Sequence, residues 1–112
     1  MAMMIGDYVC QTTFWDDFSI ADQFGVSAVK DTYERAFNEW KTNYVYLTEL
    51  VMILNHKCWQ HYDCMNKAAS KSVAEHHEKL SKLYEALYYE TYDKGFELLT
   101  GDELAYYIRT LD

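Results

Sequence analysis

The sequence predicts an all-α protein, a helical hairpin or bundle with one long central helix, a second antiparallel helix and short flanking helices. The 112 residues contain no proline and only four glycines, whereas β architectures need turn residues every few positions. Aromatic residues make up 17% of the chain, which excludes a chain that is disordered over most of its length. Because this length supports one hydrophobic core, we expect a single domain over residues 1–112.

Capping residues predict where the helices begin and end. Three pairs have the spacing of a capping box, a hydroxyl residue followed three positions later by an acid: Thr13 with Asp16, Ser72 with Glu75, and Thr100 with Glu103. Gly25 and Gly95 follow helical stretches at positions where a left-handed residue commonly ends a helix. We therefore expect helices at 16–24, 27 to about 67, 73–94 and 102–109, with residues 1–12 as a loop or a short edge segment.

The stretch from residue 27 to about residue 67 carries the strongest helical pattern. Positions alternately four and three apart form a nearly apolar seam: Tyr33, Phe37, Trp40, Tyr44, Leu47, Val51, Leu54, Cys58, His61 and Met65. One continuous helix here would be about 60 Å long, with residues 41–43 the expected place for a bend. The other segments are too short to cover such a seam, so we expect self-association as a homodimer.

Histidine and cysteine residues gather where the helix at 73–94 folds back on the long helix. In that hairpin, positions whose numbers sum to about 138 face each other, so His61 lies opposite His76 or His77, with Cys64 nearby. Imidazole and thiolate suit zinc, but the spacing matches no common ligand pair. We interpret these residues as a partly buried contact between histidines, or between a histidine and a glutamate, with Cys58 in the core. We predict no metal and no cofactor.

Neither catalysis nor DNA binding is favoured. The chain lacks the Glu-x-x-His pairs of di-iron bundles and glycine-rich loops that could form an oxyanion hole or bind phosphate. Residues 20–27 resemble the start of a helix-turn-helix unit, but Asp31 and Glu34 offset Lys30 and Arg35 in the helix that would read DNA. With a net charge of −8, we predict no direct contact with nucleic acid.

The negative charge lies at the two ends of the chain. Residues 1–40 and 85–112 each carry −5, and residues 41–84 carry +2. Tyrosines alternate with carboxylates in the helix at 73–94, a composition that favours binding of a basic protein. The residues predicted to contact that partner are Asp16, Asp17, Asp22, Tyr88, Tyr89, Glu90, Tyr92 and Asp93.

The sequence favours a cytoplasmic protein. The first ten residues lack the basic segment and apolar run of a secretion signal, and the longest apolar run, at 50–54, is far shorter than a membrane span. Three cysteines without a framework spacing indicate free thiols.

Three segments, at 15–22, 31–41 and 46–52, resemble small helical proteins encoded by bacterial phages and conjugative elements. The resemblance implies a bacterial, mobile-element origin and no particular activity. Together these observations predict a non-enzymatic protein–protein interaction module, a self-associating accessory protein of a mobile element. The alternatives are an acidic anti-defence inhibitor that mimics nucleic acid and a small metal-dependent enzyme.

Overall fold

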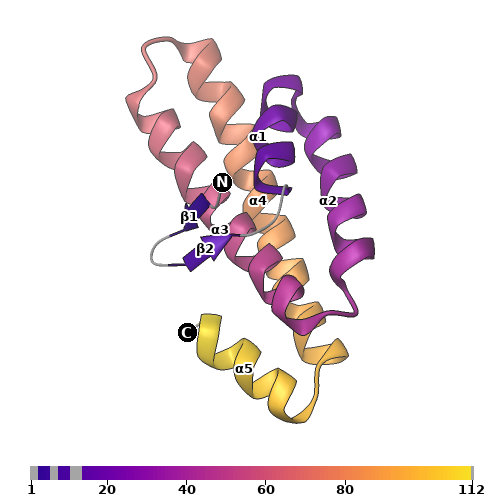
Figure 1. Ribbon diagram of the computed structural model, residues 1–112. Helices are drawn as coiled ribbons and strands as arrows, with labels where there is room; N and C mark the ends of the chain where they lie inside the picture. Colours follow the sequence, from indigo (N-terminus) through magenta and orange to yellow (C-terminus); the bar gives the residue numbers. More distant parts are fainter. Residues whose placement is uncertain (1–2, 6–7, 11–13, 112) are drawn as a thin grey trace.

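The computed structural model describes residues 3–5, 8–10 and 14–111, with side chains for 14–111. Within these residues, five helices follow one another: α1 (Phe14–Phe24), α2 (Val26–Trp40), α3 (Tyr44–Lys67), α4 (Lys71–Leu98) and α5 (Gly101–Leu111). A short antiparallel pair, β1 (Met3–Ile5) and β2 (Tyr8–Cys10), precedes them (Figure 1). The predicted all-α class is confirmed.

The helices α3 and α4 form an antiparallel hairpin, against which the other helices pack (Figure 1). Helices α1 and α2 lie side by side on it, and α5 lies against its far end. The side chain of Ser70 caps α4 by accepting from the backbone N–H of Val73 at 3.3 Å, so α4 begins two residues earlier than expected. Thr100 directly precedes α5, as expected, and Thr13 lies outside the described residues.

The prediction of one continuous helix over residues 27–67 is wrong. Helix α2 ends at Trp40, and the chain turns back so that α3 begins at Tyr44. The extended backbone of Asn43 and its side chain, which accepts from the N–H groups of Val45 at 3.1 Å and Tyr46 at 3.2 Å, make it the N-cap of α3. An asparagine that satisfies these amides favours a helix start over an uninterrupted helix, and the break falls where a bend was expected.

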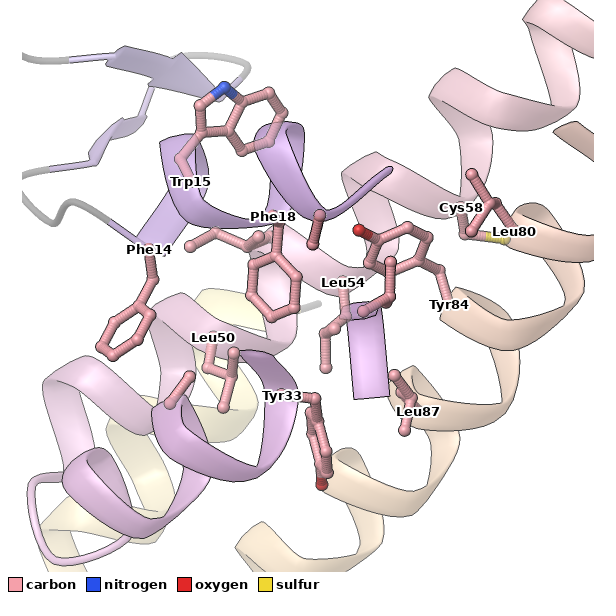
Figure 2. Close-up of a cluster of buried hydrophobic side chains, with 14 of the residues drawn as sticks. Phe14, Trp15, Phe18, Tyr33, Leu50, Leu54, Cys58, Leu80, Tyr84 and Leu87 are labelled. Carbon is pink, nitrogen blue, oxygen red and sulfur yellow. The ribbon is translucent and has the colours of Figure 1, made fainter. Parts of the chain in front are cut away.

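Because of this break, the apolar seam is buried largely within one chain. Leu47, Val51 and Leu54 are fully buried, and Tyr33 and Trp40 of α2 fold back into the same interior. Side chains from four helices meet in the main core, where Phe18 and Tyr84 lie edge to face (Figure 2). The seam therefore gives no argument for a dimer, and self-association stays a prediction.

The two glycines expected to end helices behave differently. Gly25 has a φ of 106° and alone separates α1 from α2, as predicted; this single residue is shorter than the turn of a helix-turn-helix unit. Gly95 lies inside α4, so the prediction that it ends a helix is wrong. The ring of Tyr107 from α5 lies directly over Gly95, and its hydroxyl donates to the backbone carbonyl of Tyr92 at 2.9 Å.

We predict that Gly95→Ala destabilises the protein, although alanine is normally favoured over glycine inside a helix by about 0.5–1 kcal/mol. The added Cβ would lie 2.2 Å from a ring carbon of Tyr107, and overpacking of this kind costs about 1–3 kcal/mol. Urea unfolding followed by circular dichroism measures the change. Gln60→Ala, at an exposed position of α3, is the control. A Gly95→Ala variant more stable than the native protein would contradict the close packing of α5 on Gly95.

Candidate functional site

A carboxylate from α1 lies at the centre of a polar network inside the protein. Asp22 is 8% exposed. Its Oδ1 accepts from the hydroxyl of Tyr84 on α4 at 2.5 Å, and its Oδ2 accepts from Nζ of Lys57 at 3.1 Å and Nε2 of His61 at 2.9 Å, both on α3. The sequence placed Asp22 on a partner-binding surface. The structure corrects this, because the carboxylate is enclosed and its hydrogen bonds go to α3 and α4.

Lys57 provides the positive charge of the network. It is 2% exposed, and an unpaired ammonium at that depth would be very unfavourable. Besides Asp22, its Nζ donates to Oγ of Ser19 at 2.7 Å and lies 4.6 Å from the centre of the Trp15 ring. All three partners come from α1, so the lysine holds α1 against α3.

His61 continues the network toward α4. Its ring is nearly parallel to that of Tyr84, with 5.6 Å between the ring centroids. It also stacks on the ring of His77, with 5.1 Å between the centroids. The Nδ1 atoms of His61 and His77 are 2.8 Å apart, so one of the two rings donates a hydrogen bond to the other. Antiparallel pairing of the two helices predicted that His61 lies opposite His76 or His77, and the contact between His61 and His77 confirms this prediction.

The other candidate ligands do not complete a metal site with this pair among the described residues, although the ring of His76 meets that of His77 edge to face with 5.2 Å between centroids. His76 is exposed and Cys64 half-buried, and among residues 14–111 no three histidine, cysteine, aspartate or glutamate side chains converge as a metal site. Cys58 lies in the core, as expected, where Oγ of Ser81 donates to its carbonyl at 3.0 Å. Of the contacts expected here, the one between two histidines is observed, between His61 and His77.

The network sets the protonation of its members. Burial alone would raise the pKa of Asp22, but the hydrogen bonds from His61 and Tyr84 and the charge of Lys57 outweigh burial, so that pKa is lowered. Burial and the neighbouring carboxylate raise the pKa of Tyr84 far above its ordinary value. Burial, with His61 and His76, lowers the pKa of His77. The carboxylate is thus ionised at neutral pH and the phenol stays protonated as its donor.

This arrangement supports a structural role more than a catalytic one. A carboxylate that orients a histidine is half of a general-base system, but the second ring nitrogen of His61 faces His77, where a catalytic base would face a nucleophile. Every buried side-chain polar atom in the described part of the chain has a hydrogen-bond partner. The network therefore joins α1, α3 and α4.

The predicted partner-binding tyrosines of α4 form a continuous row of rings. Tyr89 contacts Tyr88 at 5.2 Å between centroids, Tyr88 contacts Tyr92 at 6.0 Å, and Tyr92 contacts Phe96 at 5.0 Å. We call these four residues the aromatic ladder. Tyr89 is 59% and Phe96 42% exposed, whereas Tyr88 and Tyr92 are half-buried. Phe96, four positions after Tyr92, was not among the residues predicted to contact the partner.

Carboxylates accompany the aromatic ladder. Glu85, Asp93 and Glu97 are exposed, and no basic side chain among residues 14–111 forms an ion pair with them. Glu90 pairs with Lys94 at 3.5 Å. The remaining predicted residues, exposed Asp16 and half-buried Asp17, belong to α1, which lies beside α2 and away from α5 (Figure 1). Asp16 and Asp17 therefore lie on a different helix from the ladder and its carboxylates.

A groove of about 270 Å³ borders the aromatic ladder. Its walls come from α3, α4 and the last turn of α5: Met52, Asn55, His56, Trp59, Tyr88, Thr110 and Leu111. We call it the hairpin groove. Trp59 is 62% exposed and was missed in the sequence because it lies outside the seam. A second helical stripe, with Met52, Trp59 and Tyr62 at spacings of seven and three, would have indicated it.

No helix in the described part of the chain has the length and apolar character needed to cross a membrane. Comparison of the chain with protein-family models, with curated proteins and with solved structures gave no match.

We predict that Asp22→Asn lowers the free energy of unfolding by about 3–5 kcal/mol, because the ammonium of Lys57 stays buried without its counter-charge. Asp63→Asn, in an exposed pair with Lys67, should change it by about 1 kcal/mol at most. Adding Lys57→Met to Asp22→Asn should restore part of the loss. Denaturant unfolding checks all three variants, and equal costs for the two aspartates would contradict the role of Asp22.

The pH dependence of the same unfolding experiment has a defined sign. Because the pKa of Asp22 is lowered in the fold, its contribution is fully present above the unfolded value of about 3.9 and is lost as the pH falls through the lower folded value. The Asp22→Asn variant should lack this loss of unfolding free energy at acid pH. If its unfolding free energy fell with pH as steeply as that of the native protein, the assignment to Asp22 would be contradicted.

We predict that His77→Gln reduces the loss of stability between pH 7.5 and pH 5.5. A histidine whose pKa is lowered by folding stabilises the fold above its unfolded value of about 6.5, and that contribution is lost on acidification. His76→Gln, which removes only one of the influences that lower the pKa of His77, should reduce the loss less than His77→Gln does. Burial also lowers the pKa of His56, so part of the dependence remains. Thermal unfolding at both pH values measures it, and identical slopes for the two variants would contradict the assignment.

Proposed function

We propose that this chain is a non-enzymatic protein–protein interaction module that binds a basic partner through the aromatic ladder and its carboxylates. The supporting observation is the unbroken row of ring contacts from Tyr89 to Phe96, exposed at both ends. Rigid aromatic side chains provide contact area at low entropic cost and are enriched at interfaces. Contiguous apolar surface on a soluble protein commonly marks an interaction site.

Charge defines the kind of partner. Glu85, Asp93 and Glu97 have no ion pair within the described residues, and the chain has a net charge of −8. Such a surface attracts a basic protein over a distance of about 10 Å at moderate ionic strength and repels nucleic acid. The buried position of the Asp22 network is consistent with a module that acts by contact and not by catalysis.

A second candidate function is an acidic inhibitor that mimics nucleic acid. Glu90, Asp93 and Glu97 are three and four positions apart, so they share one face of α4, as a row of charges must to replace phosphates. Under both proposals the chain is an accessory protein of a mobile element, following the resemblance in sequence. Binding to a basic nuclease channel that weakens steeply with salt would favour the mimic.

The ladder can be tested by affinity capture from cells that naturally encode the chain. Tyr89→Ser with Asp93→Lys should reduce recovery of the partner by about tenfold or more, equivalent to about 1.4 kcal/mol, because it removes an exposed ring and reverses a charge. The matched control is Phe24→Ser with Asp31→Lys, another exposed aromatic and acidic pair. Circular dichroism verifies folding of both. Equal losses in the two variants, or capture of no partner by the native chain, would contradict the proposal.

A further inference from the structure

We propose that His61 and His77 form an acid-sensitive clamp, which holds the turn end of the α3–α4 hairpin closed and releases it when both rings are protonated. The turn end comprises residues 62–76, which lie at the opposite end of the hairpin from α5 (Figure 1). It is separate in the chain from the aromatic ladder, so the clamp does not depend on the proposed function.

The turn end has little else to hold its two helices together. No residue from 62 to 79 is buried, and the first buried residue of α4 is Leu80. In this stretch the contact between the Nδ1 atoms of His61 and His77 is the one side-chain hydrogen bond that joins α3 to α4, since the ion pairs there lie within single helices. Segments with few buried contacts open locally before the rest of a protein unfolds. The turn end therefore depends on this pair.

The contact of His61 with α1 determines the direction of that hydrogen bond. The ionised carboxylate of Asp22 can only accept, so Nε2 of His61 carries a proton and donates to it at 2.9 Å. In a neutral ring the other nitrogen, Nδ1, then has no proton and is an acceptor. The donor across the 2.8 Å contact is therefore the Nδ1–H group of His77.

The pair accommodates one added proton but not two. Whichever ring takes the first proton, one N–H group can still lie between the two Nδ1 atoms, because the other ring stays neutral and accepts. With a second proton both Nδ1 atoms carry hydrogen, so the contact has no acceptor and two like charges face each other across 2.8 Å. The half-buried His77 then turns toward water, whereas His61 stays bonded to Asp22.

The surroundings of the pair keep the clamp closed at neutral pH. The titratable groups around it are Asp22 of α1, Lys57 of α3, and His76 and Tyr84 of α4. Burial and the two other histidines lower the pKa of His77 and outweigh Asp22, which raises it; Lys57 already balances the charge of that carboxylate, and the phenol of Tyr84 stays protonated. The clamp is therefore closed above the ordinary histidine pKa of about 6.5 and opens as the pH falls through the lower folded value.

Amide hydrogen exchange of the full chain, measured by NMR, tests the clamp. Protection factors remove the intrinsic effect of pH on exchange. Those of the turn end should fall by about fivefold or more between pH 7.5 and pH 5.0, while those of Leu50 and Leu54 in the core should change far less. His77→Gln should abolish the local loss, because its amide can donate to His61 without becoming charged. His76→Gln should keep most of it, since it removes only one influence on the pair.

The imidazole ¹⁵N shifts of the native protein at pH 7.5 test the direction of the hydrogen bond. His61 should carry its proton on Nε2 and His77 on Nδ1, and the opposite tautomer of either ring overturns the clamp. So does unchanged protection of the turn end at pH 5.0, an equal loss in the turn end and the core, or a His77→Gln variant that keeps the pH dependence. Circular dichroism verifies that both variants are folded.

Discussion

The carboxylate of Asp22 is the interaction on which the arrangement of the helices depends. Removing a charge from water is costly unless it is paired and hydrogen-bonded, and here Lys57, His61 and Tyr84 provide both the charge and the donors. These contacts can form only when α1 lies on the α3–α4 hairpin in one position. Because Gly25 alone joins α1 to α2, the same contacts also determine where α2 begins.

Much of the fold could be predicted from the sequence, because local patterns of residues indicate it. The absence of proline and the helical spacing of apolar residues indicated the class, and antiparallel pairing placed His61 opposite His76 or His77. The break before Asn43 was only half-predicted, since the apolar seam continues through it: both α2 and α3 turn the same stripe inward. A periodic pattern cannot distinguish one long helix from two helices that pack against each other.

Apart from the contact between His61 and His77, the interior network could not be predicted, because its members are polar and far apart in the chain. Asp22 and Lys57 are 35 positions apart, and Asp22 and Tyr84 are 62 positions apart. A charged residue in an amphipathic helix normally belongs to its solvent face. The ladder was recognised because its tyrosines are neighbours in sequence, whereas the hairpin groove combines α3, α4 and α5 and is created only by packing.

Gly95 has a consequence for how this surface can change during evolution. The glycine lies beneath Tyr107 and lets α5 approach the backbone of α4, and the last turn of α5 is one wall of the hairpin groove. The width of that groove is therefore controlled by a residue that is not part of it. Substitutions under α5 could alter the shape of this surface while every groove-lining side chain stays the same, a change that inspection of the surface alone would miss.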